Sequence, residues 1–113
     1  MEPTVYFVIP CYNEEAVLPE TTRRLTEKLN AMRDTGLIGE SSRILYVDDG
    51  SKDKTWLLIS QFNRENSWVE GVKLSHNRGH QNALLCGLMS AMSRCDAAIS
   101  MDADLQDDID ALD

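Results

Sequence analysis

The sequence predicts an α/β domain in which a parallel β-sheet carries helices on both faces. Short, β-rich apolar runs recur along the chain, and segments with helical spacing of apolar residues separate them. Turn-forming glycine, asparagine and aspartate residues mark the boundaries. Strands that alternate with helices in this way are joined by right-handed crossovers, so the strands run parallel. The 113 residues correspond to one small domain or to part of a larger one.

The first strand and the first helix occupy the N-terminal third of the chain. The strand is expected over residues 5–9, a compact run of β-forming apolar residues that ends at Pro10. The helix is expected to begin at Pro19, because the first helical position tolerates the missing N–H of proline. Apolar residues at helical spacing continue the helix to Arg33, and Gly36 then breaks the chain.

The rest of the chain holds three further strands and two further helices. Buried strands are expected at residues 43–47, 69–74 and 97–101, where apolar residues gather in short runs. One helix is expected from about Asp53, and another over residues 77–92 with its apolar stripe in the core. Four strands and three helices therefore alternate along the whole sequence.

Polar residues follow each of the four predicted strands. Along the chain they are Tyr12, Asn13 and Glu14, then Asp48 and Asp49, then His76, Asn77 and Arg78, and finally Asp102 and Asp104. Ligands of parallel α/β sheets bind beyond the carboxyl ends of the strands, where the strand order reverses. With a strand order of 3-2-1-4, the first and fourth strands are neighbours and their loops form one crevice. The sequence therefore predicts a single polar site at this end of the sheet.

The charge of the chain is unevenly distributed. Its formal net charge is −8, and six of the 19 acidic residues lie within residues 102–113. The remainder is close to neutral, which argues against general nucleic-acid binding, since that requires a surplus of lysine and arginine. The longest apolar stretch is too short to span a bilayer, and no secretory leader is visible. Three cysteines without close spacing indicate reduced cytosolic thiols.

Asp102 and Asp104 directly follow the fourth predicted strand and form the candidate metal site. In an extended chain alternate side chains share a face, so both carboxylates can approach one cation. Carboxylate ligands suit Mg²⁺ or Mn²⁺, which keep coordination positions open for water and substrate phosphates. A solvated acidic turn is the alternative. Gln106 would add a neutral oxygen ligand or, alternatively, lie on the surface.

Asp48 and Asp49 end the second predicted strand, followed by glycine and serine. A plain turn with a helix cap is one interpretation, because aspartate, glycine and serine all favour that role. Two adjacent acids at the end of a buried strand also need hydrogen-bond donors, and a nucleobase N–H or a ribose hydroxyl would serve. Tyr12 offers an aromatic face for a base, or packs within its loop, and Glu14 is a candidate ligand contact.

Arg78 and Gly79 stand at the predicted start of the third helix. They could meet a phosphate through the guanidinium charge and backbone N–H groups, although a surface arginine is the alternative. His76 and His80 have no carboxylate or cysteine nearby in the pattern of a metal site, so they are expected to pack or to cap. Nucleophilic triads, the P-loop and the dinucleotide-binding glycine pattern are absent from the sequence.

Four segments carry a resemblance to a known family. They are VIPCYNEE at 8–15, VDDGS at 47–51, NRGHQNAL at 77–84 and MDADLQD at 101–107. In this order and spacing they closely resemble the family 2 glycosyltransferases of GT-A fold, whose core is a Rossmann-like sheet. The nearest subgroup looks like the polyprenyl-phosphate sugar transferases, similar to dolichol-phosphate mannose synthase and bactoprenol glucosyltransferase. The resemblance covers residues 1–113 as the N-terminal, nucleotide-binding half of such a domain.

The resemblance implies a role for each of the candidate residues. Pro10, Tyr12 and Glu14 would line the nucleotide pocket, Asp49 with Asp48 would contact the base or ribose, and Arg78 would border the nucleotide. Asp102 and Asp104 would be the catalytic pair that holds a divalent metal against the diphosphate, with Gln106 assisting. The metal would neutralise charge on the departing nucleoside diphosphate. The sugar's anomeric centre would be inverted by direct displacement.

The resemblance also implies partners and a location. The donor would be a UDP- or GDP-linked sugar, and the acceptor a polyprenyl phosphate or a glycan of the cell-envelope polysaccharides. A phosphate acceptor is already anionic near neutral pH, since its second pKa is about 6, and needs no strong general base. The full-length protein is expected in the cytoplasm or on the cytoplasmic face of a membrane. Because the acceptor-binding half is missing, the chain alone is expected to lack turnover, and an uncovered sheet surface favours a homodimer.

Two other classes of function stay open at the level of the sequence. A receiver-like phosphoacceptor domain also gathers aspartates at parallel-strand ends, but it would require a lone acceptor aspartate and a lysine after a later strand. Neither feature is evident. The second alternative is a non-catalytic α/β module that serves only association. Metal-dependent nucleotide binding would distinguish a transferase from both.

Overall fold

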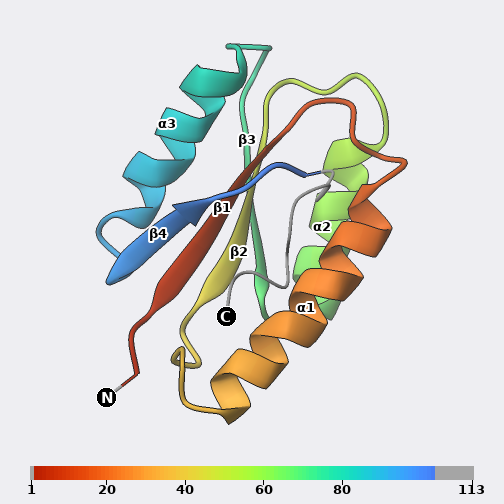
Figure 1. Ribbon diagram of the computed structural model, residues 1–113. Coiled ribbons are helices and arrows are strands. Elements are labelled where there is room, and N and C mark those ends of the chain that lie inside the picture. Colours follow the sequence, from red (N-terminus) through yellow and green to blue (C-terminus); the bar gives the residue numbers. More distant parts are fainter. Residues whose placement is uncertain (1, 104–113) are drawn as a thin grey trace.

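The computed structural model describes residues 2–103, which form a four-stranded parallel sheet with three helices (Figure 1). In chain order the elements are β1 (Val5–Cys11), α1 (Leu18–Asp34), β2 (Arg43–Asp48), α2 (Thr55–Glu65), β3 (Val69–Lys73), α3 (His80–Ala91) and β4 (Ala97–Ser100). The strand order is β3-β2-β1-β4, with every neighbouring pair parallel. The predicted α/β class and strand order are therefore confirmed.

Helices cover both faces of the sheet. Figure 1 shows α1 and α2 on one side and α3 on the other. Alternate residues of β1 divide between the two layers: Phe7 and Ile9 pack with α1 and α2, whereas Tyr6 and Val8 pack with α3. All seven residues of β1 are buried, because the strand is central and covered on both faces. This rigid strand carries the first loop of the candidate site.

The strand β1 continues past Pro10 to Cys11, although the sequence analysis ended it at the proline. Pro10 is opposite Val47 of β2, but pairing of β1 with β4 stops at Val8. The carbonyl of Val8 accepts a hydrogen bond from the N–H of Met101 at 3.0 Å, so even-numbered residues of β1 direct their backbone groups toward β4. Pro10 lies beyond the end of that pairing, where a missing N–H breaks no ladder bond.

Two helices begin later than the sequence pattern suggests. The helix α2 begins at Thr55, because the carboxylate of Asp53 accepts a hydrogen bond from the Thr55 N–H at 2.9 Å and thus precedes the helix. The helix α3 begins at His80 and not at Asn77. Gly79 has φ +92° and ψ 151°, a backbone conformation that no helix contains. The three residues from 77 to 79 are consequently a loop at the edge of the candidate site.

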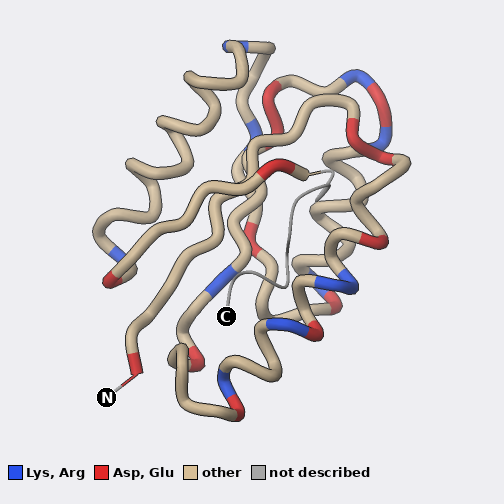
Figure 2. Tube along the Cα trace, in the orientation of Figure 1, with Lys and Arg blue, Asp and Glu red and all other residues tan. Residues whose placement is uncertain are grey.

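Charged residues are distributed unevenly over the helices (Figure 2). On α1, Arg23 forms ion pairs with Glu20 at 2.6 Å and Glu27 at 2.7 Å, all exposed to solvent. The helix α3 contains no lysine, arginine, aspartate or glutamate and exposes Leu85 and Met89. Within residues 2–103, no helix is both long and apolar enough to cross a membrane. The predicted homodimer stays a prediction.

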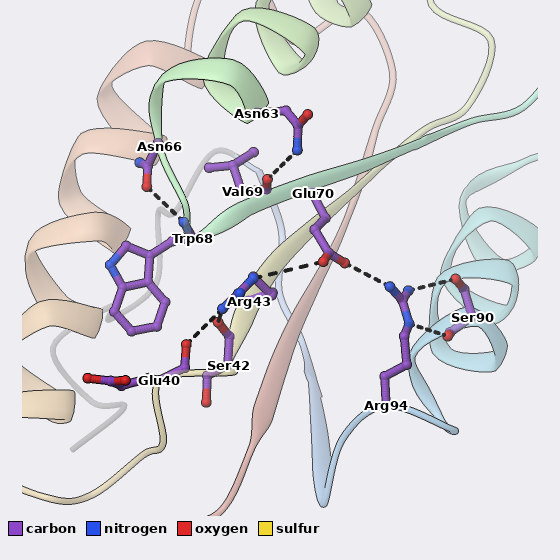
Figure 3. Close-up of polar contacts among 10 residues, drawn as sticks. All are labelled: Glu40, Ser42, Arg43, Asn63, Asn66, Trp68, Val69, Glu70, Ser90 and Arg94. Atoms are coloured by element: carbon purple, nitrogen blue, oxygen red, sulfur yellow. Dashed lines mark hydrogen bonds and ion pairs between the residues drawn. The ribbon is translucent and has the colours of Figure 1, made fainter.

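A cluster of polar contacts lies at the end of the sheet opposite the candidate site (Figure 3). The carboxylate of Glu70 on β3 lies 3.0 Å from the guanidinium of Arg94, which follows α3, and 3.8 Å from that of Arg43 on β2. Asn63 of α2 donates a hydrogen bond to the carbonyl of Val69 at 2.7 Å. These contacts join β2, β3, α2 and the segment after α3 at the start of the strands. Partly exposed ion pairs of this kind contribute up to about 1 kcal/mol each.

Candidate functional site

The loops at the carboxyl ends of the strands surround one cavity of about 440 Å³. Its wall consists of Pro10, Cys11, Tyr12, Glu14, Asp49, Asn77, Gly79, His80, Asp102 and Ala103. Tyr12 follows β1, Asp49 follows β2, Gly79 follows β3 and Asp102 follows β4. The structure thus brings together candidate residues from four distant parts of the sequence. Such a convergence is the usual arrangement for ligand binding by an open parallel sheet.

Backbone and side-chain hydrogen bonds join the first two loops of the cavity. Asn13 has a positive φ of 53°, and its N–H donates to the hydroxyl of Ser51 at 2.9 Å. Its own side-chain oxygen accepts from the N–H of Lys52 at 2.9 Å. The N–H of Glu14 donates to the hydroxyl of Thr55 at 2.8 Å. Asn13 therefore belongs to the scaffold of the site, and the loop after β1 is fixed to the loop after β2.

Asp49 joins the second loop to the third. Its side chain is almost fully buried, with 3% of the residue exposed. One carboxylate oxygen accepts from the N–H of Arg78 at 2.6 Å, and the other from the N–H of Gly79 at 3.0 Å. From the sequence, this carboxylate was expected to need donors, and a nucleobase or a ribose was a candidate. The structure shows that the chain itself supplies two.

Asp48 is buried behind its neighbour and does not line the cavity. One of its carboxylate oxygens accepts from the N–H of Ser51 at 3.1 Å. The other is buried and has no hydrogen-bond partner among residues 2–103. The two adjacent acids therefore face different surroundings, and Asp49 is the one that reaches the cavity wall.

Asp102 lies opposite the start of α3. One of its carboxylate oxygens is 3.9 Å from Nε2 of His80, and both side chains are well exposed. The sequence analysis expected His80 to pack or to cap, but the structure places it in the cavity wall. Its position within the NRGHQNAL segment, next to a glycine at a helix start, was the signal that could have found it.

The remaining predicted residues are placed as follows. Arg78 contributes its backbone N–H to the site, while the residue is exposed and is not part of the cavity wall. Asp104 and Gln106, the other predicted metal ligands, lie outside the described residues. Among residues 2–103 no three histidine, cysteine, aspartate or glutamate side chains lie together as a metal site would require. Among the described residues, Asp102 provides an exposed carboxylate at the predicted metal site.

Cys11 lines the cavity, but it is a buried thiol. Burial, together with the nearby carboxylates of Glu14 and Asp48, raises the pKa of the Cys11 thiol well above its usual range. Its Sγ lies 3.5 Å from the carbonyl oxygen of Ile9, to which it donates. A thiol held neutral in this way is a poor nucleophile, so Cys11 serves as a wall residue and not as a reactive group.

The raised pKa of Cys11 predicts a loss of stability in mild alkali. The unfolded thiol, with a pKa of about 8.5, releases its proton first, so the unfolded state is favoured as the pH rises. Between pH 8.5 and 9.5 the wild-type chain should lose about 1 kcal/mol more unfolding free energy than Cys11→Ala does. Urea denaturation at several pH values measures this difference. Parallel pH profiles of the two proteins would contradict it.

Residues 6–113 match the model of the family described as Glycosyl transferase family 2. The chain belongs to this family. It is 51% identical over 111 residues to the uncharacterized glycosyltransferase YkoT of Bacillus subtilis, covering 98% of this chain and 33% of YkoT. It is also 36% identical over 100 residues to the uncharacterized glycosyltransferase YkcC of the same organism, covering 88% of this chain and 28% of YkcC.

Solved structures of glycosyltransferases share the fold of this family 2 chain. The mannosyltransferase PcManGT from Pyrobaculum calidifontis, in complex with GDP-Man and Mn²⁺, superposes with a TM-score of 0.74 at 24% identity, covering 92% of this chain and 28% of PcManGT. S. aureus TarS 1-349, in complex with UDP-GlcNAc, gives 0.67 at 18% identity, covering 89% of this chain and 26% of TarS. These likenesses confirm the GT-A fold. The chain spans about a third of the length of YkoT.

Proposed function

We propose that the protein transfers a sugar from a nucleoside-diphosphate sugar to an acceptor, and that this chain forms the donor-binding part. One observation carries the proposal: Tyr12, Asp49 and Asp102, which follow three different strands, line one cavity in a family 2 glycosyltransferase chain. A receiver-like phosphoacceptor domain is set aside by the family membership. A non-catalytic association module remains the alternative that binding experiments address.

The wall near β1 suits a nucleoside. Tyr12 is 41% exposed and offers its ring as a stacking face for a base, while Pro10 and Glu14 stand beside it in the wall. Asp49 also lines the cavity, with its N–H bonded to the carbonyl of Cys11 beside Pro10 and Tyr12. It is a candidate contact for the base or ribose, because each carboxylate oxygen has a second lone pair. Both UDP- and GDP-linked sugars are candidate donors.

The wall between α3 and β4 suits a diphosphate with a divalent metal. Asp102 presents an exposed carboxylate to the cavity, which fits a hard cation such as Mg²⁺ or Mn²⁺ that keeps water and phosphate ligands. Asp102 would hold this ion together with Asp104, with Gln106 assisting. The bound ion would neutralise charge on the departing nucleoside diphosphate. Gly79 and His80, at the start of α3, would face the phosphates from the other side.

We further propose a polyprenyl phosphate as the acceptor and inversion at the anomeric carbon by direct displacement. A phosphate acceptor carries its own negative charge near neutral pH, since its second pKa is about 6. The described residues of the site then need only bind and orient the donor. A glycan hydroxyl would need a general base in addition. The chain alone is expected to bind donor without transferring sugar, since it spans only about a third of YkoT.

Metal-dependent nucleotide binding is the test of this function. Calorimetry with UDP and with GDP should show binding by the wild-type chain in the presence of Mn²⁺, and much weaker binding without it. Asp102→Asn should weaken Mn²⁺-dependent binding roughly tenfold or more, because an amide replaces a charged ligand. Asp34→Asn, at the exposed end of α1, is the matched control and should bind like the wild type.

Absence of nucleotide binding in Mn²⁺ would count against the proposed function and favour the association module. Binding that does not depend on the metal, or an Asp102→Asn variant with unchanged affinity, would overturn the proposed metal site. Incubation with sugar nucleotides, Mn²⁺ and a polyprenyl phosphate should give no transfer by this chain, and measurable transfer would overturn only the expectation that the chain lacks turnover.

A further inference from the structure

We infer that Asp49 is a positioning residue for donor binding: it holds the loop that opens α3, so that Gly79 and His80 form part of the cavity wall. The inference rests on the proposed function and adds to it. It assigns the carboxylate a task that concerns the phosphate side of the site, whereas the resemblance to the family places this residue at the base or ribose.

Asp49 forms a clamp, which here means that its carboxylate accepts hydrogen bonds from two consecutive backbone N–H groups. Arg78 donates to one carboxylate oxygen at 2.6 Å and Gly79 to the other at 3.0 Å. Asp49 itself is fixed, because its own N–H donates to the carbonyl of Cys11 at 2.8 Å at the end of β1. Hydrogen bonds to a charged acceptor are about twice as strong as neutral ones. The clamp therefore connects the loop before α3 directly to the central strand.

The loop depends on such a clamp for its conformation. Gly79 is the N-cap residue of α3, has a φ of +92°, and provides no side chain to cap the helix. Residues 75–80 are all exposed to solvent, and their backbone packs closely against the sheet side of the site where His76 and Asn77 approach Gly50. The side-chain oxygen of Asn77 also accepts from the Gly79 N–H at 3.0 Å, but Asn77 belongs to the same loop. Among the described contacts, the hydrogen bond to Asp49 is the one that connects Gly79 to the end of β2.

Removal of the clamp should therefore affect the phosphate side of the cavity. Gly79 and His80 line the cavity together with Asp102, and Nε2 of His80 lies 3.9 Å from a carboxylate oxygen of Asp102. If the loop moves, this separation changes and the diphosphate loses its fit, whichever base the nucleotide carries. A base contact by Asp49 without the positioning role would give a different result, because only ligands that contain a base would then be affected.

The first test compares ligands with and without a base. In Asp49→Asn one of the two N–H groups loses its acceptor, because an amide offers a single acceptor oxygen. We expect the affinity for Mn²⁺-pyrophosphate to fall by a factor of about 10, and the affinities for UDP with Mn²⁺ and GDP with Mn²⁺ to fall at least as much. Amide hydrogen exchange, measured by NMR without ligand, should show lost protection at Arg78 or at Gly79, whichever N–H then faces the amide nitrogen. This second readout does not depend on nucleotide binding.

The second test uses a variant that leaves Asp49 intact. Gly79→Ala introduces a Cβ that meets no atom within 4 Å, but its φ of +92° is unfavourable for alanine. The loop should shift away from Asp49 and weaken pyrophosphate binding as Asp49→Asn does. Because the two changes break the same contact, the double variant should bind within about twofold of either single variant. Independent roles would multiply the two losses.

Controls and outcomes separate this inference from the proposed function. Asp96→Asn removes a carboxylate that accepts from the N–H of Thr4 at 2.8 Å at the far end of the sheet, and it should leave all affinities unchanged. If Asp49→Asn weakens nucleotides but not pyrophosphate, or leaves the exchange at both Arg78 and Gly79 unchanged, the positioning role is wrong. If the wild-type chain binds none of the three ligands, the proposed function fails and the inference falls with it.

Discussion

Gly50→Ala is expected to lower the unfolding free energy by about 3 kcal/mol and to disrupt the candidate site. Gly50 has a φ of +72°, which disfavours any residue with a Cβ. An added Cβ would also lie 2.4 Å from the backbone nitrogen of Asn77 and 2.6 Å from the carbonyl carbon of His76. Backbone atoms cannot rotate away as a flexible side chain can. The turn after β2 and the loop before α3 would have to separate.

The matched control for this change is Gly36→Ala. Gly36 has a similar φ of +80°, but an added Cβ would meet nothing within 4 Å, so only the backbone strain of about 1 to 2 kcal/mol remains. The difference in unfolding free energy between the two variants, measured by urea denaturation, is the contribution of the close backbone contact at Gly50. Calorimetry with nucleotide and Mn²⁺ shows whether the candidate site still binds. Equal destabilisation of both variants, with nucleotide binding retained in Gly50→Ala, would show that the loops are not held in contact.

The fold was predictable from the sequence because its signals are local. Apolar runs and helical periodicity specified each element, and the alternation of strands and helices specified the parallel sheet, which the order β3-β2-β1-β4 confirms. The errors lie where tertiary contacts decide. Pro10 remains in β1 because β4 ends before it, and residues 77–79 stay outside α3 because Gly79 adopts a positive φ. Neither fact is visible in the amino-acid types alone.

The location of the site was predictable from the sequence, but the contacts within it were not. Polar residues at strand ends indicated where the cavity forms, and the structure brings Tyr12, Asp49 and Asp102 to it. The need of Asp49 for donors was also inferred, yet its donors come from residues 29 and 30 positions away along the chain. His80 was missed for the same reason. Its neighbour Asp102 approaches it only once β4 has paired with β1.

Gly87→Leu is expected to destabilise the chain by about 3 kcal/mol or more, because α3 lies directly against the sheet at this position. A Cβ on Gly87 would be 2.4 Å from Cγ1 of Val8 and 2.7 Å from Cγ2 of Val47, and both valines are fully buried. Leucine is a better helix former than glycine, so helix propensity alone would predict a gain of about 1 kcal/mol. The sign of the measured change therefore separates packing from propensity.

Gly87→Leu should also disturb the candidate site, because the helix that it displaces begins at His80 in the cavity wall. Cys86→Leu introduces the same side chain one residue earlier, at an exposed position, and should change stability by less than about 0.5 kcal/mol. Gly87→Ala should cost about 1 kcal/mol less in a Val8→Ala background, because the nearest methyl group is then absent. Denaturation of these variants measures both differences. Equal costs of Gly87→Ala in the two backgrounds would mean that α3 does not rest on Val8, and the placement of His80 beside Asp102 would lose its structural basis.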